Sequence, residues 1–171
     1  RSNRAIFGDA AAATLISYDY EEHIGEFLFG TDGSGFDKLI VKNGCSRNRF
    51  DNAANEINYG TNNIYTDNHL YMNGPDIFKF SNEVIPDFTK EVLLKNETEI
   101  GKVHQFIFHQ ANAFMLNFMR KKLHIDYSKF FIDLVDGGNT VSCTIPIALK
   151  KYSLNKVDSK LENIAIVGFG V

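Results

Sequence analysis

The sequence predicts an α/β domain in which helices cover a largely buried sheet. Two short apolar runs, 106–108 and 164–167, are typical of strands that are buried on both faces. Segments with apolar residues at helical spacing lie between the strand-like stretches, and this alternation is the pattern of layered α/β domains. We therefore expect residues 1–171 to form one such domain, or half of a larger one.

The first third of the chain predicts two strands and a long loop. Residues 10–18 are apolar and end in β-branched and aromatic side chains, and residues 24–29 have strand character before the glycine-rich turn at 30–35. We expect these two segments to be adjacent strands. Residues 44–73 are rich in Asn, Asp, Gly, Ser and Tyr without clear periodicity, so we expect a long surface loop there.

A helix is predicted after the turn residues 73–75. Its apolar side chains approximate a single face, and Pro86 is expected to kink or divide it because proline lacks the amide hydrogen of a regular helix. The residues of this face are Ile77, Phe78, Val84, Ile85, Phe88, Val92 and Leu93.

The second half of the chain predicts strands that lead into polar corners and helices. The strand at 106–108 runs into the polar residues 109–112 and then into a second helix, on which Phe114, Met115, Phe118 and Met119 recur at helical spacing. A short strand at 130–135 precedes a glycine turn and the apolar segment 141–149. A proline costs about 3 kcal/mol inside a regular helix. Because of Pro146, we expect an irregular first turn or a helix that begins near Ile145.

Composition excludes several classes of protein. The chain has 18 basic and 21 acidic residues, a net charge of −3, so it lacks the basic footprint of a nucleic-acid-binding protein. No apolar stretch approaches the roughly 20 residues of a membrane span, and no secretory leader opens the chain. Cys45 and Cys143 are too few for a disulfide framework. We expect no membrane association, free thiols and a cytoplasmic location.

The two ends of the sequence suggest a piece of a longer protein. The chain opens with Arg1, and its final strand runs into the glycine turn 168–170, which leads to no further element. Such a strand normally delivers the chain to a following element. We therefore expect further residues in the natural protein.

Two polar residues at strand ends are the best candidates for chemistry. In open α/β sheets, ligands gather where strands end and helices begin. His109 follows the strand 106–108 and can serve as an acid, a base or a hydrogen-bond donor; the alternative is a histidine that satisfies a buried backbone group. Asn139 precedes an apolar helix, where capping is the alternative role. If the two converge, imidazole and carboxamide form a donor pair for developing negative charge.

Other chemical motifs are missing or weak. The sequence contains no GxSxG, GxxxxGK(S/T) or HExxH motif, and its five histidines have no chelating spacing, so we predict no metal site. Cys143 lies among apolar residues, where a packed, inert thiol is usual. The basic run 120–122 closes the second helix and either stabilises the helix dipole or docks an acidic partner.

Several segments together resemble the C-terminal half of the ketoacyl-(acyl carrier protein) synthases III, condensing enzymes of the thiolase-like superfamily. His109-Gln110-Ala111-Asn112 followed by Gly138-Asn139-Thr140 is the specific part of this resemblance. It covers nearly the whole chain, and its other segments are Phe7-Gly8-Asp9-Ala10, Met72-Asn73-Gly74, Ile145-Pro146-Ile147-Ala148-Leu149 and Gly168-Phe169-Gly170-Val171.

The resemblance implies a fold and a reaction. The fold is half of a five-layered αβαβα subunit, with a mixed five-stranded sheet covered by helices, in an enzyme that is usually a homodimer. An acyl group would pass from acyl-CoA to a cysteine of the absent N-terminal half. Malonyl-acyl carrier protein would then be decarboxylated to an enolate, with His109 and Asn139 completing the catalytic set and no cofactor required. This is an acyltransferase of fatty-acid biosynthesis, and the isolated chain would be inactive without the cysteine.

The resemblance also assigns binding residues. Asn112 and Gly74 match positions that line the pantetheine tunnel, and Val171 matches a position whose backbone N–H helps to form an oxyanion hole. Lys121 and Lys122 match basic positions that dock the carrier protein, although Phe114 stands where many members have an arginine.

Two alternatives remain open at this point. The first is a related acyltransferase of a specialised pathway, since the same Cys-His-Asn set can serve acyl transfer to oxygen or nitrogen. The second is a catalytically silent homologue that binds carrier protein. A cysteine in the N-terminal half that faces His109 would favour catalysis.

Overall fold

The computed structural model describes residues 2–58, 64–155 and 163–170, and these residues form two compact units. The first unit contains residues 2–5 and 30–80, and the second contains residues 6–29 and 81–170. The two candidate catalytic residues, His109 and Asn139, both belong to the second unit.

A three-stranded parallel sheet is the centre of the second unit. Strand β5 (Gln105–Phe108) lies between β6 (Phe130–Phe131) and β7 (Ile164–Val167). In register, Phe106 pairs with Phe130 on one side and with Ala165 on the other. All four residues of β5 are buried, which agrees with the continuous apolar run that predicted a strand covered on both faces.

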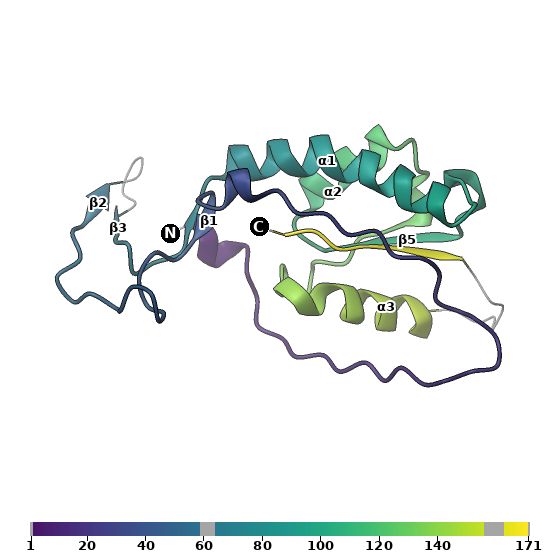
Figure 1. Ribbon diagram of the computed structural model, residues 1–171, viewed down its shortest axis with the longest axis horizontal. Coiled ribbons are helices and arrows are strands. Elements are labelled where there is room, and N and C mark those ends of the chain that lie inside the picture. The colour runs from purple at the N-terminus through teal and green to yellow at the C-terminus, as the bar shows by residue number, and fades with distance from the viewer. Residues whose placement is uncertain (1, 59–63, 156–162, 171) are drawn as a thin grey trace. The chain divides into compact units, whose positions relative to one another are not determined.

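Helices cover both faces of this sheet (Figure 1). Helix α1 (Gly74–Lys95), most of which belongs to the second unit, and α2 (Ala113–Lys122) lie on one side, and α3 (Thr144–Leu154) lies on the other. The fully buried core between them is made mainly of apolar side chains, which confirms the predicted α/β class. It includes Val103, Phe106, Ile107, Phe108, Leu116, Met119 and Leu123.

The predicted pairing of residues 10–18 and 24–29 as strands is wrong in this structure. Neither segment forms a strand, and in the described residues the central sheet has three parallel strands rather than the five mixed strands expected. Around Glu26, side chains at the C-terminal end of α1 and directly after it bind the backbone groups that a strand would use. Asn96 accepts from the Glu26 N–H (2.8 Å) and donates to its carbonyl (3.0 Å), and Lys95 donates to the Phe27 carbonyl (2.7 Å). β-propensity alone therefore did not decide the structure here.

Strand β6 is shorter than the predicted segment 130–135. After Phe131 the backbone binds a side chain instead of a neighbouring strand, because the Asp133 N–H donates to Gln110 Oε1 (2.8 Å). Gln110 is buried and also donates from Nε2 to the Phe108 carbonyl (2.7 Å). The residue after His109 therefore joins the ends of β5 and β6.

Pro86 does not divide α1, which runs unbroken through it. The expected irregular start of the last helix is confirmed. A 3-10 turn over Val141–Cys143 precedes α3, which places Pro146 in its first turn, where amide hydrogens need no helical partner.

The described strands of the first unit are all two residues long. Strand β1 (Leu39–Ile40) pairs with β4 (Tyr71–Met72), and β2 (Ile57–Asn58) pairs with β3 (Ile64–Tyr65), both antiparallel. The described part of the predicted loop 44–73 therefore consists of turns and two-residue strands.

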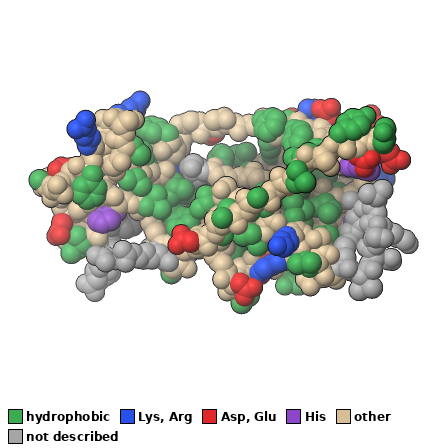
Figure 2. Space-filling view, turned by 90° about the horizontal axis from the view of Figure 1, so that it is seen from below, with side chains coloured by type: hydrophobic (Ala, Val, Ile, Leu, Met, Phe, Trp, Pro, Cys, Tyr) green, Lys and Arg blue, Asp and Glu red, His purple; other side chains and the backbone are tan. Residues whose placement is uncertain are grey.

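Hydrophobic side chains reach the surface at many points of the face shown in Figure 2. In the second unit, residues 15–29, which include parts of both segments that were expected to form strands, expose six large hydrophobic side chains by 60% or more, namely Leu15, Ile16, Tyr18, Tyr20, Phe27 and Phe29. No helix in the described part of the chain is long and apolar enough to cross a bilayer.

Candidate functional site

His109 lies at the carboxyl end of the central strand, where parallel sheets collect ligands. Its backbone N–H donates to the carbonyl of Val167 (2.8 Å), so the end of β7 fixes the height of this residue above the sheet. The Phe169 ring stands edge-on to the imidazole, with ring centroids 5.2 Å apart. The end of β7 therefore fixes the backbone of His109, and Phe169, which follows β7, packs against its ring.

The imidazole of His109 is half-buried and hydrogen-bonded through one nitrogen. Its Nδ1 lies 2.6 Å from Oγ1 of Thr144, the first residue of α3. Burial lowers the pKa of His109 from its usual value, and a backbone hydrogen bond in which Val141 accepts opposes part of this change. Desolvation disfavours the charged ring, so the neutral form predominates at neutral pH. Nε2 is left as the nitrogen available to a substrate.

The backbone of Asn139 is fixed by the N-terminal segment of the second unit. Asn139 forms a parallel bridge with Phe7, in which its N–H donates to the Ile6 carbonyl (3.0 Å) and its carbonyl accepts from Gly8 (2.9 Å). A Cβ on Gly8 would overlap the Gly137 carbonyl. The Phe7-Gly8 segment of the family resemblance therefore serves to hold Asn139.

The side chain of Asn139 is buried and has a fixed orientation. Its Oδ1 accepts from the Val141 N–H (2.9 Å), which is the kind of capping contact that the sequence offered as the alternative role. Capping does not exclude chemistry, because an amide whose oxygen is engaged presents its NH₂ group as a donor to the other side. The structure therefore shows the capping contact of Asn139, and its part in the chemistry stays a prediction.

Val141 joins the two candidate residues. Its φ of +55° is left-handed, an uncommon conformation for a β-branched residue. In this conformation its N–H binds Asn139 Oδ1 and its carbonyl accepts from Thr144 Oγ1 (3.0 Å), the hydroxyl that contacts His109. The structure therefore brings His109 and Asn139 to one turn, while the meeting of their free donors on one substrate oxygen stays a prediction.

Sequence reasoning missed Thr144, Val141 and Gln110 as parts of this arrangement. Thr144 and Val141 lie in an apolar segment, where helix packing was the natural interpretation, and a left-handed valine has no signature in sequence. Gln110 could have been found, because a glutamine two residues after a buried strand has to satisfy its amide.

The predicted substrate-binding residues have different positions. Asn112 caps α2, with its Oδ1 accepting from the Met115 N–H (2.8 Å). Gly74 is the first residue of α1 and belongs to the first unit. Val171 lies outside the described residues. The roles of all three in binding a substrate stay predictions.

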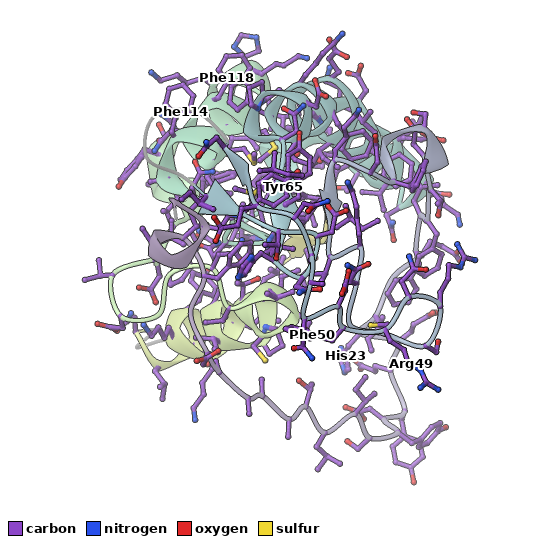
Figure 3. The ribbon with its side chains drawn as sticks, turned by 90° about the vertical axis from the view of Figure 1, so that its left-hand side faces the viewer. His23, Arg49, Phe50, Tyr65, Phe114 and Phe118 are labelled. Carbon is purple, nitrogen blue, oxygen red and sulfur yellow. The ribbon has the colours of Figure 1, made fainter. Side chains whose placement is uncertain are left out.

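The two predicted docking lysines differ in their surroundings. Lys122 donates from Nζ to the backbone carbonyl of Asn82 on α1 (2.6 Å), so its ammonium is engaged within the chain. Lys121 is exposed, and no described residue forms an ion pair or hydrogen bond with its ammonium. Phe114 and Phe118, one turn apart, lie on the same side of α2 (Figure 3), and both are exposed.

Other features of the described residues offer no second reactive centre. His, Cys, Asp and Glu residues in the described ranges form no group of three that could hold a metal ion. Cys143 is half-buried, and its thiol donates to the Ala10 carbonyl (3.3 Å). A groove of about 450 Å³ lies along β7 between residues 23–28 and the C-terminal part of α1, and none of the predicted site residues lines it.

Comparison with known proteins agrees with the resemblance found in the sequence. Residues 93–171, which include His109 and Asn139, match the family described as 3-oxoacyl-(acyl-carrier-protein) synthase III C terminal. The chain is 31% identical over 170 residues to a β-ketoacyl-(acyl-carrier-protein) synthase III of Clostridium botulinum (strain 657), and 32% identical to one of Clostridium acetobutylicum. Each alignment covers 99% of this chain and 50% of the relative, so the chain spans about half the length of these curated relatives.

Solved structures give the same result for the fold. A 3-oxoacyl-(acyl-carrier-protein) synthase III is similar with a TM-score of 0.85 and 37% identity, covering 92% of this chain and 47% of that one. The enzyme of Pseudomonas aeruginosa PAO1 is similar with a TM-score of 0.73 and 25% identity, covering 99% and 48%. The thiolase-like fold is thereby confirmed, and the chain is similar over nearly its whole length to about half of known 3-oxoacyl-(acyl-carrier-protein) synthases III, with residues 93–171 matching their C-terminal family.

Proposed function

We propose that this chain is the C-terminal catalytic half of an enzyme that condenses an acyl group from acyl-CoA with malonyl-acyl carrier protein at the start of fatty-acid biosynthesis. The observation that carries the proposal is the turn at Val141, which links His109 and Asn139 at the carboxyl edge of the sheet. Both residues belong to the part of the chain that matches the synthase III family.

The reaction needs a stabilised enolate. The acyl group first forms a thioester with a cysteine of the N-terminal half, and coenzyme A leaves as its thiol. In malonyl-acyl carrier protein the bond between the methylene carbon and the carboxylate then breaks, carbon dioxide leaves, and the electron pair moves to the thioester oxygen. The methylene carbon attacks the acyl thioester, the new carbon–carbon bond forms, and the cysteine thiolate departs.

The geometry of the site suits the middle step. The NH₂ group of Asn139 is directed away from Val141 because its oxygen is engaged there, and the buried amide cannot rotate without losing that bond. A preorganised donor of this kind stabilises charge that develops on an oxygen without the cost of reorienting solvent. His109 supplies the second group through Nε2.

The wider surface supports a chain that works as part of a longer protein. The chain spans about half of its curated relatives, and the segment 15–29 of the second unit exposes large apolar side chains. Exposed apolar area on this scale is typical of surfaces that another part of a protein covers. We extend the proposal to a cytoplasmic homodimer of full-length chains, meaning this chain together with its N-terminal half.

Asn139→Ala in the full-length protein tests the proposed function. We expect carbon dioxide release from malonyl-acyl carrier protein to fall by about 10²–10³-fold, while transfer of a radiolabelled acyl group from acyl-CoA to the cysteine changes much less. The reason is that acylation can use backbone donors near the cysteine. An equal loss in both half-reactions, or in neither, would contradict the role assigned to Asn139.

Carbon dioxide release also separates this proposal from acyl transfer to oxygen or nitrogen. A wild-type enzyme that forms the acyl-cysteine but never decarboxylates malonyl-acyl carrier protein would favour the specialised acyltransferase. A full-length protein without a reactive cysteine would favour the silent carrier-binding homologue.

A further inference from the structure

The hydroxyl of Thr144 occupies an unusual position between two hydrogen-bonding groups of the site. Its Oγ1 lies 2.6 Å from His109 Nδ1 and 3.0 Å from the carbonyl oxygen of Val141. Thr144 is buried, with 3% of its surface exposed, so these contacts are not exchanged for water. The hydroxyl has one proton and can donate one hydrogen bond to either of its two neighbours. The neighbour that accepts this hydrogen bond decides the tautomer of the imidazole.

Two arrangements satisfy all three groups. In the first, Thr144 donates to the Val141 carbonyl, and His109 Nδ1–H donates to Thr144; the neutral ring then has a lone pair on Nε2. In the second, the hydroxyl rotates and donates to Nδ1, and the proton of the ring is on Nε2. Only the second makes neutral His109 a donor toward a substrate oxygen.

The Val141 carbonyl cannot replace the hydroxyl as a hydrogen-bond donor to Nδ1. A carbonyl only accepts, so it can bind Nδ1–H but cannot support an unprotonated Nδ1. The backbone contact from Val141 raises the pKa of His109, which is the effect of an acceptor that favours a protonated ring nitrogen. Without the hydroxyl, the surroundings of Nδ1 would therefore hold the ring in the tautomer that has no donor on Nε2.

We propose that Thr144 is a positioning residue that gives His109 access to both neutral tautomers by rotation of its hydroxyl between Val141 and Nδ1. The inference rests on the proposed function, since it concerns how His109 becomes a donor to the malonyl thioester oxygen. In the acyl-enzyme, the rotated hydroxyl sets the Nε2–H tautomer. In the resting structure, the donation of Thr144 to Val141 sets the Nδ1–H tautomer.

Nitrogen-15 NMR of the histidine rings in the full-length protein tests the proposal directly. The shifts of Nδ1 and Nε2 report which nitrogen has the proton, and His109→Gln assigns the signals. The comparison is made on the acyl-enzyme, in which we expect the wild type to have its ring proton on Nε2. There, Thr144→Val, which removes the hydroxyl at nearly constant shape, should raise the Nδ1–H population. Thr144→Ser, which keeps the hydroxyl, should restore the wild-type shifts.

Activity gives the second readout. Thr144→Val should lower decarboxylation by about 10²-fold, the lower end of the usual range for loss of a positioned proton donor, while Thr144→Ser retains most of it. Thr89→Val is the matched control, because Thr89 is also buried and donates its hydroxyl to a backbone carbonyl, that of Ile85 (2.7 Å), but lies on α1 away from the site. We expect this control to change stability without changing the ring shifts of His109.

The two readouts separate this inference from the proposed function. Unchanged tautomer populations in the acyl-enzyme of folded Thr144→Val would overturn the role of Thr144, whatever the activity. Shifts that respond as expected in a protein that never decarboxylates malonyl-acyl carrier protein would support the role of Thr144 and overturn the proposed function instead. Folding of each variant is checked by its melting temperature, and if Thr144→Val does not fold, Thr144→Ala serves the same comparison.

Discussion

The ammonium of Lys122 at the end of α2 donates a hydrogen bond to the backbone carbonyl of Asn82 on α1 (2.6 Å). Asn82 lies four residues before Pro86, so its carbonyl is the one that the amide of residue 86 would bind in a regular helix. Proline has no amide hydrogen, and a buried carbonyl without a partner is costly. Lys122 supplies the missing donor, which explains how α1 continues through a buried proline.

This relationship predicts that Lys122→Met destabilises the full-length protein. We expect a loss of about 1–3 kcal/mol in the free energy of unfolding, because a carbonyl that has been withdrawn from water loses its charged donor. Urea denaturation measures it. Lys121→Met is the matched control on the neighbouring exposed residue and should change stability by less than about 0.5 kcal/mol.

A double-mutant cycle with Pro86→Ala makes the cause explicit. Alanine restores the amide that can bind the Asn82 carbonyl, so Lys122→Met should cost much less in the Pro86→Ala background than in the wild type. Equal costs in the two backgrounds would show that Lys122 stabilises the protein in some other way.

Carrier-protein docking is predicted to depend on Lys121. Its side chain is exposed and makes no ion pair with a described residue, whereas Lys122 is engaged with Asn82. Lys121→Glu should raise the KM for malonyl-acyl carrier protein by about 3–10-fold at low salt, and the difference should shrink as salt screens the charges. Acylation by acyl-CoA, which needs no carrier protein, is the internal control. A KM that does not change would exclude Lys121 from the docking surface.

The stability of the protein should depend on pH through His109. Burial lowers the pKa of His109 in the folded state, so between that pKa and the ordinary value near 6.5 the unfolded chain binds more protons than the folded one. Stability therefore rises with pH through this window and is lost as pH falls through it. The difference in unfolding free energy between wild type and His109→Gln, followed from pH 8 down to pH 5, should shrink or reverse toward acid. A difference independent of pH would contradict a lowered pKa.

Much of the sheet and its helices could be predicted from periodicity. The strand at 164–167, the helix that follows the 109–112 corner, and the irregular start near Ile145 all follow from local patterns, because buried parallel strands and amphipathic helices have strong signatures. The resemblance to a known family added the assignment of His109 and Asn139, which position alone left balanced against packing and capping.

Contacts between distant residues could not be predicted in the same way. The segment 24–29 has strand propensity, but the amide of Asn96 and the ammonium of Lys95 satisfy its backbone instead. Nothing local in the sequence indicates that Lys122 reaches the carbonyl of Asn82, or that Thr144 reaches His109. Such pairings depend on the packed arrangement of whole elements. In the sequence, a lysine at a helix end that docks a partner therefore cannot be distinguished from one that replaces a missing amide donor.

The left-handed backbone of Val141 leads to the last prediction. A residue other than glycine pays roughly 1–2 kcal/mol for this conformation, and Val141 is 59% exposed, so little packing offsets the strain. Val141→Gly removes the strain but adds flexibility to the unfolded chain, which costs roughly 0.5–1 kcal/mol. We expect a net gain in stability of up to about 1 kcal/mol in urea denaturation.

The same substitution should lower activity. Strained residues at functional sites are held in place by their surroundings, and a freer residue 141 would let its N–H leave Asn139 and its carbonyl leave Thr144. We expect decarboxylation to fall several-fold while acylation by acyl-CoA is retained. Val135→Gly is the matched control, since Val135 is 94% exposed and does not have a positive φ. This control should not gain stability and should not lose decarboxylation activity. If Val141→Gly were less stable than Val135→Gly, the left-handed turn would not be strained, and its link to the two candidate catalytic side chains would need another explanation.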